Sequence, residues 1–159
     1  MSEDYEVLYV LARNDLDSLN PGKLAAQVAH AATQLSEFMY NEVDHDSLLF
    51  ITYKRWTQQA FHFGTVITLA ATREQLLDFS EKEPHPSEQL AKDDTIDPTY
   101  PFIVNKEYLD IMKRFDIIVS HQKIGDNKFA ATRSEHTCSW IFGMKSVVGK
   151  YVEGLDLYK

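Results

Sequence analysis

The stretch NPGKLAAQVAHAA, residues 20–32, decides the fold that we expect for this chain. Its leading asparagine can cap a helix, and Pro21 suits the first helical position, so the stretch predicts the start of a helix. Alanines cover much of this helix and allow it to approach a sheet closely. Lys23, Gln27 and His30 follow one another at spacings of four and three residues, so they share one side of the helix, which differs from the alanine-covered side.

Strand and helix patterns alternate outward from this helix. EVLYVLAR, residues 6–13, precedes it and reads as a buried strand. The expected strands are 6–13, 65–71, 116–122 and about 137–143, and the expected helices are 21–43, 46–61, 72–83 and 106–115. This order predicts an α/β fold, a three-layer sandwich in which a small mixed, mostly parallel sheet of about four strands has helices on both faces.

A chain of 159 residues is expected to form a single domain. Every proline except Pro21 falls within residues 84–101, where hydrophobic periodicity is weak. We therefore expect a proline-rich loop or lid at about 84–101.

Composition limits the classes of protein to which the chain can belong. The hydrophobic fraction of 44% is enough for an ordinary core, and no apolar run has the length of a membrane span. The acidic N-terminus does not resemble a signal peptide. A single cysteine, Cys138, excludes an internal disulfide and a multi-cysteine zinc site. These features predict a cytoplasmic protein that does not associate with membranes.

The net charge of -8 argues against indiscriminate binding to nucleic acid. Acidic residues are concentrated in residues 74–97, whereas basic residues outnumber acidic ones in residues 113–150. The basic segment either faces an anion or is ordinary solvated surface.

The side of the helix that carries Lys23 has two interpretations. A lysine in the first turn opposes the helix dipole, and together with free N–H groups it makes an anion site. His30, two turns further on, could then bind a second part of the same ligand. In the alternative interpretation the three residues are a solvated polar stripe.

Other chemical motifs are weak. The six histidines lack paired metal-ligand spacing, and the nearest candidate, DHD at residues 44–46, reads as a polar start to a helix. Cys138 reads as a buried structural thiol, and it shares a face of the last strand with Trp140 and Phe142, which we expect in the core. Glycine-rich phosphate-binding motifs and a GxSxG nucleophile motif are absent from the sequence.

The strand EVLYVLARNDL followed by GKLAAQVAHAA resembles the signature of the type II peptidyl-tRNA hydrolases, the archaeal and eukaryotic-type enzymes. In that family a strand that ends in an acidic turn precedes a helix with Gly-Lys, Ala-Ala-Gln and His-Ala. Trp56, Gln58 or Gln59, and GTVITLAATREQLLDF resemble later family features in the same order. The resemblance extends over residues 6–79.

The resemblance implies a small α/β enzyme that cleaves the ester between a peptide and the 3′ end of tRNA, with neither a metal nor an organic cofactor. Lys23 would hold phosphate or stabilise developing negative charge, and His30 would orient substrate or water. Residues that would contact the substrate are Gly22, Gln27 and Asp15. Asp15 has an alternative role, because an acidic residue in a turn often fixes only its own backbone.

The family also has an Asp-Ala-Gly followed closely by Thr after its third strand, and this chain lacks that block. The corresponding stretch offers two candidate replacements. Asp126 and Thr132 could supply a carboxylate and a hydroxyl, or His121 could act as the base. Lys128 and Arg133 could reach the phosphates of an acceptor stem.

Two functional hypotheses follow. The first is a hydrolase of peptidyl-tRNA or a related ester. The second is a non-catalytic member of the same fold that binds tRNA, a nucleotide or a protein through the side of the helix with Lys23. The alanine-rich helix and an edge strand would both suit a homodimer.

Overall fold

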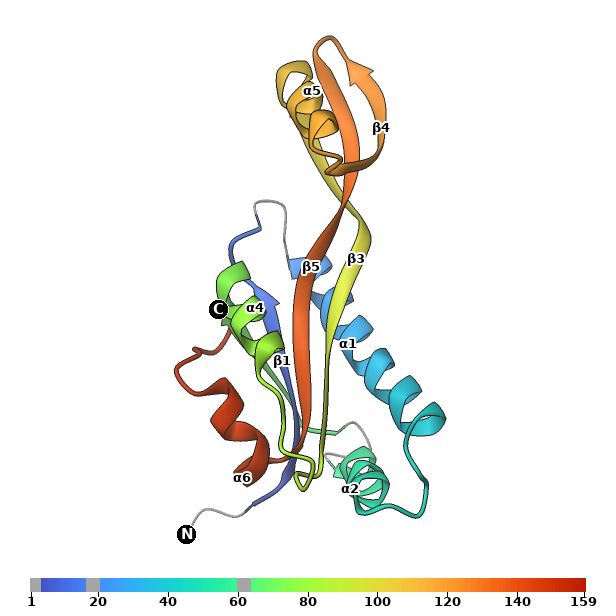
Figure 1. Cartoon of the computed structure of the whole chain (residues 1–159), viewed down its shortest axis with the longest axis vertical. Helices are drawn as coiled ribbons and strands as arrows, with labels where there is room; N and C mark the ends of the chain where they lie inside the picture. Colours follow the sequence, from blue (N-terminus) through green and yellow to red (C-terminus); the bar gives the residue numbers. More distant parts are fainter. Residues whose placement is uncertain (1–3, 17–20, 60–63) are drawn as a thin grey trace. The chain divides into compact units, whose positions relative to one another are not determined.

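The computed structural model describes residues 4–16, 21–59 and 64–159, and its centre is the strand β1 (Glu6–Arg13). All eight residues of β1 are buried. β1 pairs in parallel with β2 (Val66–Ala71) and antiparallel with β5 (Lys128–Met144). A strand buried on both faces needs helices above and below it, and Figure 1 shows α1 on one side and α4 with α6 on the other.

One face of the sheet packs against α1 (Pro21–Asn41) and α2 (Leu48–Thr57). α1 buries a stripe at a spacing of four residues, which is the helical repeat expected for a core-facing side. Trp56 of α2 is buried against Phe142, with ring centroids 5.5 Å apart. Trp140, Phe142 and Cys138 belong to the same core cluster, so their predicted place in the core is confirmed. Asn20, the predicted cap of α1, lies outside the described residues.

The other face packs against α4 (Arg73–Glu81), α6 (Lys145–Val148) and the short helix Gly149–Val152. The predicted capping box is confirmed: the Thr72 hydroxyl accepts the Gln75 N–H at 3.2 Å, and the Gln75 side chain accepts the Thr72 N–H at 2.9 Å. Helices on both faces agree with the predicted layers.

The sheet differs from the prediction in size and direction. Within the described residues it has five strands, four of them in the order β2-β1-β5-β3, with β4 pairing only with β5. It is mixed and not mostly parallel, because β5 runs antiparallel to both β1 and β4. β5 has 17 residues, because the strand that we expected at about 137–143 already begins at Lys128.

The predicted loop at 84–101 is wrong for residues 90–101, which belong to the strand β3 (Leu90–Asn105). β3 ends the strand order and is therefore an edge strand. Edge strands tolerate proline because one side of the backbone needs no hydrogen-bonded neighbour. The prolines at 98 and 101 thus mark an edge and not a break in the sheet.

The chain divides into two compact units, residues 4–95 with 138–159 (apart from the gaps in the description), and residues 96–137. The smaller unit contains the outer part of β3, α5 (Lys106–Arg114), β4 (Ile118–Gly125) and the first part of β5. Asn105 caps α5 by accepting the Tyr108 N–H at 2.9 Å. Asn127, in the turn between β4 and β5, has φ of 60° and accepts the Lys106 N–H at 3.1 Å.

The last residues of the chain add to the free edge of β2. The Ala70 N–H donates to the Asp156 carbonyl at 2.9 Å, and the Tyr158 N–H donates to the Thr68 carbonyl at 3.0 Å. Leu157 forms an antiparallel bridge with Leu69. This segment therefore protects an edge that would otherwise be open to pairing with another chain. In the part of the chain that the structure describes, no helix is long and apolar enough to cross a membrane.

Gly64 provides a test of the packing around Trp56. It has φ of 78°, and a Cβ added there would lie 2.5 Å from the Trp56 ring. Gly64→Ala should lower the free energy of unfolding by roughly 3 kcal/mol, because left-handed strain adds to overpacking. Denaturant unfolding measures this loss.

Gly154→Ala is the matched control, because Gly154 has φ of 84° but open space within 4 Å of an added Cβ. This variant should lower the free energy of unfolding only through the left-handed backbone strain, by about 1 kcal/mol. Equal losses in the two variants would show that contact with Trp56 does not limit residue 64.

Candidate functional site

The side of α1 that carries Lys23 and Gln27 turns toward the sheet. Gln27 is only 5% exposed and continues into the buried stripe of α1, and Lys23, one turn earlier, is half-buried. The backbone carbonyl of Gln27 accepts the Cys138 thiol at 3.6 Å. His30 is exposed. A fully solvated stripe therefore does not describe this side of α1, because Gln27 belongs to the interior.

Cys138 is a buried free thiol in β5, as predicted. It lies opposite Ala12, one residue before the end of β1. The contact with Gln27 thus places the first turns of α1 beside the carboxyl end of β1. In open α/β sheets, ligands bind where helices begin at the carboxyl ends of the strands.

A second glutamine, Gln34, organises polar groups beneath the same helix and is not among the residues predicted from the sequence. Its side-chain oxygen accepts the Thr95 hydroxyl at 2.7 Å and the Trp140 indole N–H at 3.0 Å. Thr95 and Trp140 are both buried. A sequence signal was present, because Gln34 follows Gln27 by seven residues and so lies on the same side of the helix.

On the opposite face of the sheet, Asp94 joins three elements. Its Oδ1 accepts the Ser80 hydroxyl of α4 at 2.7 Å and the Ser139 hydroxyl of β5 at 2.6 Å. Ser139 alternates with Cys138 along β5, so the two side chains point to different faces. Asp94 therefore ties β3 to α4 and β5 on the side of the sheet away from α1.

Asp15, predicted to contact substrate, is held by protein groups. It pairs with Arg13, and its Oδ2 accepts the Arg73 backbone N–H at 3.0 Å at the start of α4. Burial raises the pKa of Asp15, but the Arg73 N–H and the Arg13 guanidinium outweigh burial and hold this pKa below its usual value. These contacts favour the alternative role, in which the carboxylate fixes the end of β1.

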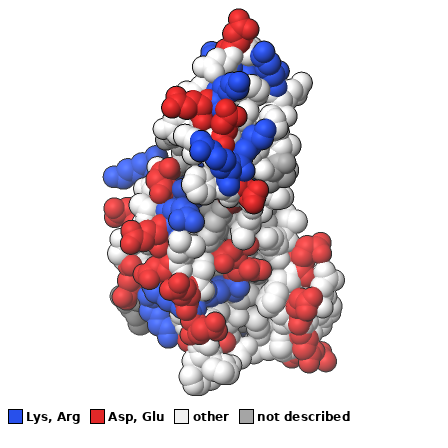
Figure 2. Space-filling model, turned by 45° about the horizontal axis from the view of Figure 1, so that its top comes forward, with Lys and Arg blue, Asp and Glu red and all other residues white. Residues whose placement is uncertain are grey.

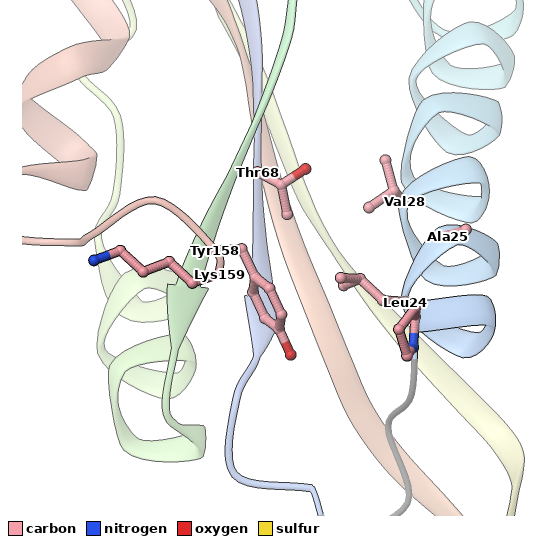
Figure 3. A pocket seen from close by; sticks show the side chains of 7 residues that line it. Leu24, Ala25, Val28, Thr68, Tyr158 and Lys159 are labelled. Atoms are coloured by element: carbon pink, nitrogen blue, oxygen red, sulfur yellow. The ribbon is translucent and has the colours of Figure 1, made fainter.

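A cavity of about 670 Å³ lies on the other side of α1. Figure 3 shows Leu24 and Val28 of α1 opposite Thr68 of β2 and Tyr158. The Tyr158 hydroxyl donates to the Arg13 carbonyl at 3.0 Å. Gln27 contacts β5, whereas this cavity borders β2. Gln27 and the cavity therefore lie on two different sides of α1, with the first turn of the helix between them.

Five of the predicted site residues belong to the smaller unit, namely His121, Asp126, Lys128, Thr132 and Arg133. The other five, Asp15, Gly22, Lys23, Gln27 and His30, belong to the larger unit. The two groups are therefore carried by different compact units.

Within the smaller unit, the predicted catalytic residues do not form one cluster. Thr132 pairs with Ser120 across the strands, and their hydroxyl oxygens are 2.9 Å apart. His121 is the next residue of β4, so its side chain points to the opposite face from Thr132. Asp126 lies in the turn, about 15 Å along β5 from Thr132 at 3.3 to 3.4 Å per residue.

The two basic residues of this unit have different surroundings. Lys128 is exposed beside the turn. Arg133 is partly buried, with Nε 2.9 Å from Glu135 and its guanidinium 4.6 Å from the Phe102 ring centre. Arg133 is thus engaged within the protein, and Lys128 is the more accessible of the two.

The surface charge of the chain is mixed. Figure 2 shows basic and acidic side chains interspersed over the face that it presents.

Among the described residues, no group of three or more His, Cys, Asp and Glu side chains is arranged to hold a metal ion. At residues 44–46 the Asp44 carboxylate accepts the Asp46 N–H at 2.9 Å, and Ser47, not an aspartate, caps α2.

Comparison with known proteins identifies one relationship. The sequence model of the peptidyl-tRNA hydrolase PTH2 family matches residues 6–92, which run from β1 to the beginning of β3. A comparison with curated proteins found no match. The matched stretch contains β1, α1 and Trp56, which carried the resemblance in the sequence.

Asp15→Asn should lower the melting temperature at pH 7, because it removes the charge paired with Arg13. A carboxyl whose pKa is lower in the folded chain stabilises the fold above its unfolded pKa, about 4. That contribution is lost as the pH falls through the folded pKa. The difference in melting temperature between wild type and variant should therefore be constant from pH 7 to 5 and shrink below about pH 4.

Asp78→Asn on the exposed side of α4 is the control and should leave the melting temperature unchanged near neutral pH. A difference for Asp15→Asn that stays the same, or grows, down to the lowest pH of the scan would contradict a stabilising role for the ionised carboxylate.

Proposed function

The chain belongs to the peptidyl-tRNA hydrolase PTH2 family, and on that premise we propose that it hydrolyses the ester between a peptide and tRNA. In this reaction water adds to the ester carbonyl carbon and loses a proton. The bond to the 3′ oxygen of tRNA then breaks, and that oxygen takes up a proton. The products are a tRNA with a 3′ hydroxyl and a peptide carboxylic acid, which releases its proton to solvent and becomes the carboxylate.

The observation that carries the proposal is the start of α1. Here the buried Gln27 contacts Cys138, which lies opposite Ala12 near the carboxyl end of β1, and the half-buried Lys23 lies one turn before Gln27. The N–H groups in the first turn of a helix and a nearby ammonium group both favour negative charge. Negative charge is present on the tRNA phosphates and develops on the carbonyl oxygen during attack. We assign Lys23 and the N–H groups around Gly22 to one of these charges.

His30 is the second assigned group on this helix. It follows Lys23 by seven residues, which places it two turns, or about 10.5 Å, further along α1. It is exposed, so it can meet a substrate that also contacts Lys23. We assign it to orienting the substrate or the attacking water. Gln27 then supports the position of α1 through Cys138, and Asp15 fixes the end of β1 against the start of α4.

The cavity beside Leu24 and Val28 supports the binding of an ester with an apolar substituent. It is large enough for an amino-acid side chain or a nucleobase, and Thr68 and Tyr158 add polar atoms to mostly apolar walls. A substrate that reaches both this cavity and Lys23 would cross the first turn of α1.

Two alternative bases belong to the proposed reaction. One route uses Asp126 with Thr132, and the other uses His121. Because His121 and Thr132 point to opposite faces of the β4–β5 hairpin, the two routes exclude each other. Lys128 is assigned to contact with RNA phosphates, and Arg133 would have to leave Glu135 to make the same contact.

A non-catalytic binding role is the second candidate. The lack of an Asp-Ala-Gly block favours it, as does the separation of Asp126, Thr132 and His121 along the hairpin. Such a protein would keep the anion site at α1 and bind tRNA without cleaving it.

The test is cleavage of a labelled peptidyl-tRNA by the purified chain. Lys23→Ala should reduce kcat/KM by about 100-fold or more, which is typical of removing one charge-stabilising group. His30→Ala should reduce it by a factor of about 10 to 100, because an orienting group contributes less than the anion site. Lys54→Ala and His45→Ala remove an exposed lysine and an exposed histidine elsewhere in the larger unit, and each should keep full activity.

Binding of tRNA, measured in the same samples at low and physiological salt, separates the two candidates. Cleavage that depends on Lys23 supports the hydrolase, and salt-sensitive binding without cleavage supports the binding protein. Neither cleavage nor binding by the wild-type chain would refute both.

A further inference from the structure

α5 carries an apolar face that is exposed in the smaller unit. Tyr108 is 59% exposed, Ile111 38% and Phe115, directly after the helix, 72%. Their spacing of three and four residues places them along one side, like the seam positions of a coiled coil. Leu109 is the residue of α5 that is buried. The helix is thus anchored through Leu109, while its larger apolar side faces solvent.

Two charged residues follow the same seven-residue spacing. Glu107 and Arg114 each come immediately before an exposed aromatic residue, Tyr108 or Phe115. They therefore lie on the same flank of the apolar face, with the acidic group near the start of α5 and the basic group near its end. Within the described residues neither has an ion-pair partner.

We propose that this face binds the same face of a second copy of the chain, with the two α5 helices antiparallel about a two-fold axis. The axis passes near Ile111, so that Tyr108 of one copy meets Phe115 of the other. The two-fold axis brings this flank of one α5 against the same flank of the other α5. Because the helices run in opposite directions, the start of one helix lies beside the end of the other. Glu107 then meets Arg114 of the second copy, and the symmetric pair forms at the other end.

Charge selects this arrangement over the parallel one. In a parallel pair the flank with Glu107 and Arg114 would face the opposite flank of the second helix, where Met112 lies. The two charges would then gain no partner. In the antiparallel dimer Glu107 and Arg114 of each copy are paired with Arg114 and Glu107 of the other, which gives two ion pairs. The charges of α5 are therefore complementary to themselves only in the antiparallel orientation.

The contact is small. α5 has nine residues and is about 13.5 Å long at 1.5 Å per residue. Ile117 extends the apolar area, since it is 44% exposed and its N–H donates to the Met112 carbonyl at 3.0 Å. An interface of this size forms a weak dimer that dissociates on dilution. Its formation does not depend on the proposed reaction.

Sedimentation measured over a range of protein concentrations tests the dimer. Wild type should pass from monomer to dimer as the concentration rises. Glu107→Arg alone and Arg114→Glu alone should each raise the dimer dissociation constant by about tenfold or more, because two attractive pairs become repulsive. The double variant should restore the wild-type value.

An equimolar mixture of the two single variants should also associate as strongly as wild type, since one chain then carries only basic and the other only acidic groups on this flank. Asp110→Arg and Lys113→Glu are matched controls, because they make the same charge changes on α5 away from the apolar face. Circular dichroism melts show whether each variant is folded.

A wild-type chain that stays monomeric at the highest soluble concentration would overturn the proposal. A dimer that keeps its strength in both Glu107→Arg and Ile111→Asp would overturn it too, because another surface would then hold the copies together. A mixture of the two single variants that fails to associate would exclude the antiparallel register.

Discussion

The burial of β1 is the constraint on which the larger unit depends. None of its eight residues is on the surface, so apolar side chains from both faces need cover. α1 and α2 cover Leu8 and Val10, and α4 with the C-terminal helices covers Val7, Tyr9 and Leu11. The hydrophobic effect thus fixes where α1 begins relative to the end of β1. The candidate site is a consequence of that placement.

The same constraint explains why polar groups are found beneath α1. A helix that packs closely on a sheet cannot leave a buried amide without partners. Gln34 meets this need through Thr95 and Trp140, and the backbone carbonyl of Gln27 accepts the Cys138 thiol as an additional contact. These contacts hold the helix in one rotation about its axis. That rotation turns Gln27 toward β5, while Leu24 and Val28 border the cavity toward β2.

Features with short-range causes could be predicted from the sequence. β1 has the predicted bounds because its eight residues form a continuous buried run, and the Thr72 and Gln75 capping box depends only on four adjacent residues. β3 was missed because proline signals dominate residues 84–101, while the neighbour that makes this segment an edge strand is β5, far along the chain. The relation between His121 and Thr132 likewise depends on the register of β4 against β5. Such long-range pairing leaves no local pattern.

The proposed hydrolysis breaks the bond between the peptide carbonyl carbon and the 3′ oxygen of tRNA. The most direct measurement is single-turnover reaction with peptidyl-tRNA in water enriched in oxygen-18, followed by mass spectrometry of both products. We expect release that requires the protein, with one heavy oxygen in the new peptide carboxylate and none in the tRNA hydroxyl. Label in the tRNA, or release no faster than in buffer alone, would contradict this bond cleavage.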